Sequence, residues 1–256
     1  MIRLTRLLGV QVRRALLESL SWRGFLVTLV VNQAVTPLLG LAVWSAALPG
    51  RSEVTAYYAA LLVVQLATVS YEHHTLSNGI YAGALTGDLL RPQPQVLGPL
   101  GQNLALRVWH LLFGLPVVVG AVLAAGAPFA PAALLAAVPA IVLAAALRFL
   151  FTYTLALSAF WTQRAHGVVG FGETLVFLLG GAAAPIPLLP AAVRRPGEAL
   201  PFRAMLGFPA EVAAGGLGAR ELAEGYAWQA AWTVAFALAA VVVWRRGVRR
   251  YTAHGA

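Results

Sequence analysis

Apolar stretches of roughly membrane-spanning length alternate with short polar segments along the whole chain. A helix needs about 20 mostly apolar residues to cross a hydrocarbon core of roughly 30 Å. The stretches that come close to or meet this length are 24–48, 54–71, 104–125, 132–161, 168–189 and 226–244. They predict an all-α polytopic membrane protein with six transmembrane helices, forming a single transmembrane domain over residues 1–256.

The composition agrees with a membrane protein. Of the 256 residues, 60% are hydrophobic and only 11% are charged, whereas soluble domains average roughly 25% charged residues. All 18 basic residues are arginines, and they lie between the apolar stretches. A nucleic-acid-binding protein would instead gather its basic residues on one folded face. The chain has no cysteine, which excludes disulfides and thiolate metal sites.

The distribution of arginines predicts the orientation. With the N-terminus in the cytoplasm, twelve arginines fall on the inside and five on the outside. Four of the outer five share one long loop with four glutamates, so the net charge of that loop is about zero. The positive-inside rule therefore places both termini in the cytoplasm.

The first 22 residues form a separate element. Apolar residues recur there at helical spacing between Leu4 and Leu20, with arginines among them. This pattern predicts an amphipathic interfacial helix that contacts anionic lipid. A solvated basic tail and a cleaved signal peptide ending near Ser45-Ala46-Ala47 are alternatives, but the apolar stretch before that site is longer than a typical signal.

A polar, glycine-containing segment, 72–95, separates the second and third apolar stretches. Asn78-Gly79 is a turn signal, and apolar residues from Ile80 to Leu90 predict one face of a short helix. Glycines 79, 83 and 87 would leave one flank of that helix bare, and Arg91-Pro92 would end it. The orientation makes this segment cytoplasmic. A surface helix lying on the headgroups is the alternative.

Ionisable residues within the apolar stretches mark functional or paired positions. They are Arg107, His110, Arg148 and Glu173. Depths counted along the predicted helices place Glu173 close to the depth of His110, and we expect Glu173 to pair with Arg107 or His110. Arg148 falls near the middle of the bilayer and is not expected to reach Glu173. This pair would either be a structural ion pair that stabilises the bundle or contact a substrate or a proton.

Several short motifs resemble ABC-2-type permeases, the membrane subunits of bacterial ABC exporters. The run from Gly83 to Pro92, GALTGDLLRP, is similar to a stretch of that family. Ala159-Phe160-Trp161, the segment 181–190, Leu200-Pro201-Phe202 and Phe208-Pro209 are similar too, in the same order. The resemblance extends over nearly the whole length, from the amphipathic N-terminal helix to the basic C-terminus.

The resemblance implies a cytoplasmic coupling helix over Thr75–Leu90 that docks on an ATPase subunit. The positions it implicates are Thr75, Asn78, Gly79, Tyr81, Gly83, Leu85, Gly87, Asp88, Arg91 and Pro92. It also implies a re-entrant outer hairpin in the region 185–209. The residues of that hairpin are Pro185, Pro187, Pro190, Pro201 and Phe202. The first three prolines independently rule out one straight helix there.

The chain carries no G-x-x-x-x-G-K-[ST] motif and no lysine, so any ATP hydrolysis belongs to a separate chain. We therefore expect a non-enzymatic permease without a cofactor of its own, with ATP-Mg bound on a partner ABC ATPase. A second permease, homologous or identical, would complete the path in the bacterial inner (plasma) membrane, with lipid around it. No metal site is expected, since His73-His74 has no further ligand cluster. Alternatives are a secondary transporter, disfavoured because no internal repeat is evident, and a scaffold or assembly protein acting without an ATPase.

Overall fold

The structure, a computed structural model, describes residues 2–21, 23–71, 73–126 and 129–251. All regular elements in these ranges are helical. The bounds of the α-helices are α1 Ile2–Leu20, α2 Arg23–Ala47, α3 Ser52–Thr68, α4 His73–Tyr81, α5 Leu85–Leu89, α6 Leu97–Ala125, α7 Pro131–Ala156, α8 Ala165–Leu179, α9 Ala191–Ala199, α10 Pro201–Met205, α11 Gly207–Ala214 and α12 Ala219–Val248. Two short 3-10 helices are η1 Leu157–Phe160 and η2 Ile186–Leu188.

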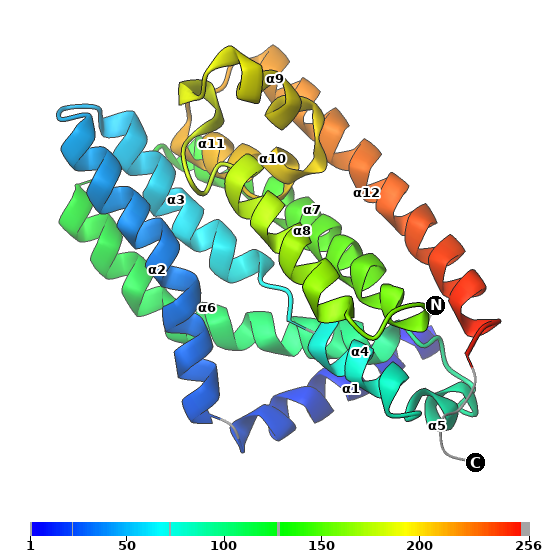
Figure 1. Ribbon diagram of the computed structural model, residues 1–256. Helices are drawn as coiled ribbons and strands as arrows, with labels where there is room; N and C mark the ends of the chain where they lie inside the picture. The colour runs from blue at the N-terminus through cyan, green and yellow to red at the C-terminus, as the bar shows by residue number, and fades with distance from the viewer. Residues whose placement is uncertain (1, 22, 72, 127–128, 252–256) are drawn as a thin grey trace.

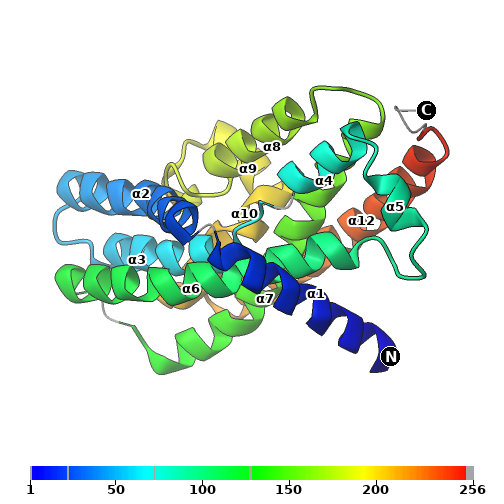
Figure 2. The same cartoon turned by 90° about the horizontal axis from the view of Figure 1, so that it is seen from below.

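The long helices α2, α3, α6, α7, α8 and α12 form a bundle (Figure 1). Helices α4 and α5 lie at one end of this bundle, which we call the α4–α5 end. Helix α1 crosses the start of α6 at the same end (Figure 2). Helices α9, α10 and α11 close the opposite end, which we call the α9–α11 end. The amphipathic N-terminal helix predicted from the sequence is therefore present as α1.

Five stretches are long and apolar enough to cross a membrane. They are Gly24–Ala47, Ser52–Tyr81, Leu97–Leu123, Pro131–Phe160 and Ala219–Val248. The fifth expected span is shorter than predicted, because α8 ends at Leu179. Its 15 residues extend about 22 Å, less than a typical hydrocarbon core. The chain turns at once after α8, where Gly181 adopts a left-handed φ of 94° that favours glycine.

Helix α3 forms the centre of the bundle, packed against α2, α6, α7 and α11. Its residues Tyr58, Leu61 and Val64 are fully buried, and they belong to one core cluster with Leu147 of α7 and Phe208 of α11. Burial of this extent on nearly every face is expected for a central helix of a membrane bundle, whose outer helices carry the lipid-facing surface.

The last helix is fastened to the bundle by polar and steric contacts. The buried side chain of Gln229 on α12 donates to the carbonyls of Ala140 on α7, at 2.8 Å, and Ala204 on α10, at 2.9 Å. Gly225 lets the ring of Phe208 lie directly against the α12 backbone, where any β-carbon would clash. These contacts hold α12 beside α7 and α10.

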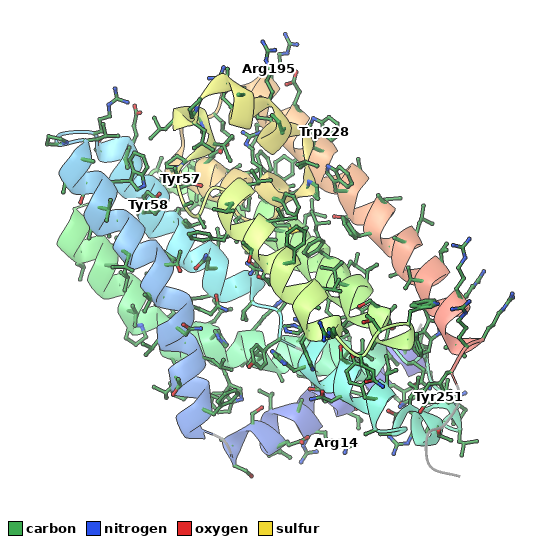
Figure 3. The ribbon with its side chains drawn as sticks, viewed as in Figure 1. Arg14, Tyr57, Tyr58, Arg195, Trp228 and Tyr251 are labelled. Atoms are coloured by element: carbon green, nitrogen blue, oxygen red, sulfur yellow. The ribbon has the colours of Figure 1, made fainter. Side chains whose placement is uncertain are left out.

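The proline-rich region at the α9–α11 end folds into the short helices η2, α9, α10 and α11, and no single straight helix runs through it. Pro201 and Phe202 are buried, and α11 packs against α3 and α7 inside the bundle. Pro187 and Pro190 are not buried. The preceding turn is held by Tyr57 and Trp44, which donate to the carbonyls of Gly181, at 2.9 Å, and Ala183, at 3.1 Å. Tyr57 and Tyr58 point toward this end of the bundle (Figure 3).

Candidate functional site

The segment between α3 and α6 forms two helices rather than the single helix expected over Thr75–Leu90. Helix α4 ends at Tyr81 and α5 begins at Leu85. The break falls at Gly83, which has a left-handed φ of 75° that a side chain would strain. Helix α5 ends at Leu89, before Arg91-Pro92, as the proline predicts. The single-helix prediction was wrong because spacing alone does not reveal a left-handed glycine.

Helix α4 is attached to the beginning of α8 by its side chains. The Tyr81 hydroxyl donates to the carbonyl of Thr162, at 3.0 Å, and accepts from the backbone N–H of Ala165, at 2.9 Å. Asn78 Oδ1 lies 3.0 Å from His166 Nε2, and the rings of His74 and His166 stack with centroids 4.9 Å apart. The first N–H groups of a helix lack partners within the helix, so Tyr81 also stabilises the start of α8.

The residues of this segment divide between anchors and an exposed tip. Leu85 is 5% exposed and packs in a cluster with Ile80 and Tyr153, so its side chain is not part of the exposed surface. Leu89 is 39% and Leu90 is 83% exposed. The remaining exposed positions around this tip include Thr86, Gly87, Arg91 and Pro92. We call Leu89, Leu90, Arg91 and Pro92 the α5 tip.

Two of the three glycines in this segment face open space. A β-carbon at Gly79 or Gly87 would meet nothing within 4 Å. Gly79 and Gly87 therefore leave backbone uncovered on two separate helices, α4 and α5, whereas their spacing predicted one bare flank of a single helix. Gly83 differs, because its role is to form the turn. Asp88 and Arg91 form an exposed ion pair at 3.1 Å, and Thr75 lies exposed on α4.

A groove of about 440 Å³ lies beside α4, between η1 and the end of α12. Its walls include Tyr81, Phe160, Trp161, Gln163, Arg250 and Tyr251. Trp161 is 44% exposed, and Tyr251 approaches α5 through a 3.4 Å contact with Thr86 (Figure 3). Of these residues, only Tyr81 was predicted to belong to the site. The motif Ala159-Phe160-Trp161 was the one available signal.

The chain between α3 and α4 is held by polar side chains from neighbouring helices. The carbonyl of Val69 accepts from Asn103 and from Arg107, each at 3.2 Å. The hydroxyls of Ser70 and Thr152 lie 2.8 Å apart. Because a backbone carbonyl outside a helix needs a partner when it is buried, these contacts stabilise the interruption between the central span and α4.

Glu173 pairs with Arg148, not with Arg107 or His110 as expected. The Arg148 Nη2 and a Glu173 carboxylate oxygen lie 2.5 Å apart. Arg107 also donates to the carbonyl of Ala145, at 2.6 Å, and His110 Nδ1 lies 2.9 Å from the carbonyl of Leu106. The prediction was wrong because α7 ends at Ala156, earlier than expected. Arg148 and Glu173 thus each lie eight residues, about 12 Å, from the facing helix ends.

The comparison with known families decides the class of this protein. A family model described as an ABC-2 family transporter protein matches residues 50–255. The chain belongs to the ABC-2 transporter family. It is thus an ABC transporter permease, a multi-pass membrane component of a transporter that is not itself catalytic. No curated protein and no solved structure matches the chain.

Membership of the ABC-2 family bears on the exposed residues of the α4–α5 end. ABC-2 membrane proteins work with ATPase subunits in ABC transporters. A permease of this kind needs a surface that is exposed for the partner and rigidly joined to the spans. The α5 tip is exposed, and α4 is fastened to α8 by the contacts of Tyr81 and Asn78.

Replacing Tyr81 by phenylalanine is expected to lower the free energy of unfolding by about 1–2 kcal/mol. The change leaves the N–H of Ala165 and the carbonyl of Thr162 without their hydroxyl partner. Thermal unfolding of the purified permease measures the effect. Tyr251→Phe is the matched control, since its hydroxyl makes only an exposed contact with Thr86. Equal stability of the two variants would contradict the anchoring role of Tyr81.

Proposed function

We propose that this ABC-2 permease is the membrane subunit of an ATP-driven exporter and that a separate ATPase docks on its α4–α5 end. The observation that carries the proposal is the contrast within the segment 73–92. Leu90 is 83% exposed, yet the helix that it ends, α5, is anchored by the buried side chain of Leu85. The helix before that, α4, is tied to α8 through Tyr81 and Asn78. An exposed apolar side chain on a firmly anchored element is a typical docking anchor.

The contacts of α4 provide a route from the docking surface into the membrane. Movement of α4 would act on the start of α8 through Tyr81 and His166. Further along α8, Glu173 joins α7 through its ion pair with Arg148. Displacement of α4 by an ATPase would therefore change the orientation of α8 relative to α7. This rigid-body mechanism is consistent with alternating access between two arrangements of the bundle.

The exposed face of α8 supports pairing with a second permease. A β-carbon added at Gly167 or Gly170 would meet nothing within 4 Å, and Thr174 is exposed on the same helix. Small residues spaced in this way let membrane helices approach closely. Phe171, 67% exposed, flanks them. We propose that a homologous or identical subunit covers this face and that the translocation path runs between the two permeases.

We further propose six crossings in the bacterial inner membrane, with α8 and the segment after it as the fifth and with both termini in the cytoplasm. Most arginines then lie inside, including those that end α12. The region 185–209 would form the re-entrant outer hairpin, which the inward packing of α10 and α11 supports.

Single cysteines test this orientation, because the chain has none of its own. In right-side-out spheroplasts, a membrane-impermeant maleimide is expected to label Leu188→Cys, at the α9–α11 end. It should label Leu90→Cys only after permeabilisation. Both side chains are exposed on the protein, so labelling depends on which side of the membrane the reagent can reach. Labelling of Leu90→Cys in intact spheroplasts would contradict the proposed orientation.

The exporter proposal is tested by purifying the tagged chain under mild detergent and measuring vanadate-sensitive ATP hydrolysis in the product. We expect a co-purified ATPase in stoichiometric amount, with an activity that the permease chain cannot supply, since it lacks the lysine of a nucleotide-binding loop. Reproducible absence of any ATPase would contradict the proposal and favour a secondary transporter or a scaffold protein.

A further inference from the structure

A second groove at the α4–α5 end lies apart from the α5 tip, between α1, α2 and α6. Its volume is about 340 Å³. Residues of its walls include Glu18, Ser19, Leu26, Leu29, Gln102 and Leu106. Neither the contacts of α4 with α8 nor the exposed tip of α5 uses this groove, although Thr75 of α4 reaches its edge.

The walls of the groove change from polar to apolar along its length. Glu18 is exposed and belongs to α1, the amphipathic helix that crosses the end of the bundle (Figure 2). Leu26 is only 4% exposed, and Leu29 lies about one turn further along α2. An amphipathic helix of this kind lies at the headgroup level, and a membrane-spanning helix leads from there into the hydrocarbon. The groove therefore has the polarity profile of a phospholipid.

The charges beside the groove select a headgroup. Arg14 and Glu18 are four residues apart on α1, a spacing that commonly gives ion pairs. Within the described part of the chain, however, no ion pair joins them. Arg14 projects from α1 away from the bundle (Figure 3), so the Glu18 carboxylate is left for a cation from outside. A headgroup that carries an ammonium beside its phosphate complements this arrangement, whereas a purely anionic headgroup does not.

We propose that this groove binds one molecule of phosphatidylethanolamine from the adjacent leaflet. The ammonium group contacts the Glu18 carboxylate at the polar end of the groove, and one acyl chain follows Leu26 and Leu29. Bound lipid would fill the space between α1 and α2 and hold the amphipathic helix against the bundle. The residues that carry this site belong to α1 and α2, and none of them is part of the proposed docking surface at the α5 tip.

Native mass spectrometry of the full-length purified permease, titrated with phosphatidylethanolamine or phosphatidylglycerol, tests the proposal. We expect one phosphatidylethanolamine adduct to form preferentially. Glu18→Gln should lower this preference by up to about fivefold, as for the loss of an exposed ion pair. Leu29→Trp should remove the adduct by filling the groove. The matched controls are Glu53→Gln, an exposed carboxylate at the other end of the bundle, and Leu39→Trp, on the exposed face of α2.

Three results would overturn the proposal. They are an unchanged lipid preference in Glu18→Gln, a preference of the unsubstituted chain for phosphatidylglycerol, and equal lipid retention in Leu29→Trp and Leu39→Trp. Each variant is judged to be folded when it elutes from a size-exclusion column at the same volume as the unsubstituted chain. Because the measurement needs no ATPase, its failure would leave the exporter proposal standing, and failure of the exporter proposal would leave the lipid site standing.

Discussion

Replacing Glu173 by leucine is expected to lower the free energy of unfolding by about 3–5 kcal/mol, because Arg148 then stays buried without a counter-charge. The side chain of Arg148 is 6% exposed and that of Glu173 is 30% exposed. The Arg148 Nε and Nη1 atoms are buried without a partner within the described residues, so the carboxylate is the group that compensates the charge. Chemical unfolding of the purified permease in detergent measures the difference.

The double variant Arg148→Leu/Glu173→Leu separates the pair from its individual charges. Removing both charges eliminates the buried cation, and apolar replacements of buried ion pairs are often neutral or stabilising. We therefore expect the double variant to recover most of the stability lost in Glu173→Leu. A double variant that is as unstable as the single one, or a single variant as stable as the unsubstituted chain, would contradict this account. Transport by the recovered double variant would assign the pair to structure rather than to a substrate or proton contact.

Replacing Leu90 by aspartate is expected to reduce the amount of co-purifying ATPase at least roughly tenfold, the effect of losing one interface anchor of about 2 kcal/mol. The side chain is 83% exposed and lies at the end of α5, so the permease itself should keep its stability. ATPase bound per permease, measured after purification under mild detergent, gives the result.

Leu188→Asp is the matched control for this prediction. Leu188 is also an exposed leucine, 38% exposed, but it lies in η2 near the α9–α11 end. It should retain the ATPase fully. Equal losses in both variants would attribute the effect to general damage, and full retention in Leu90→Asp would show that the α5 tip is not the docking anchor.

The long apolar stretches made the helical bundle predictable from the sequence, because a membrane requires both their length and their composition. Helix bounds were less predictable. Helix α8, which corresponds to the fifth predicted span, ends at Leu179, where Gly180 and Gly181 turn the chain. The residues that follow remain apolar. Composition alone does not distinguish apolar residues in a crossing helix from apolar residues in a buried turn.

The candidate site was predictable in position but not in geometry. The polar segment, its glycines and its terminal proline indicated an element outside the bundle. The left-handed conformation of Gly83 and the contacts of Tyr81 with the start of α8 depend on tertiary packing, which a single sequence does not display. The partner of Glu173 was missed for a related reason. An error of about five residues in the end of one helix shifts a side chain by about 7 Å along the axis.

Crosslinking from position 90 reports whether an ATPase contacts the α5 tip. A cysteine at Leu90, in a chain that otherwise has none, is coupled to a photoreactive maleimide in inverted membrane vesicles and irradiated, with Leu188→Cys in spheroplasts as the control. We expect position 90 to form an adduct with a nucleotide-binding ATPase and position 188 to form none. The absence of an ATPase adduct at position 90 in vesicles that retain ATP-driven transport would contradict this expectation.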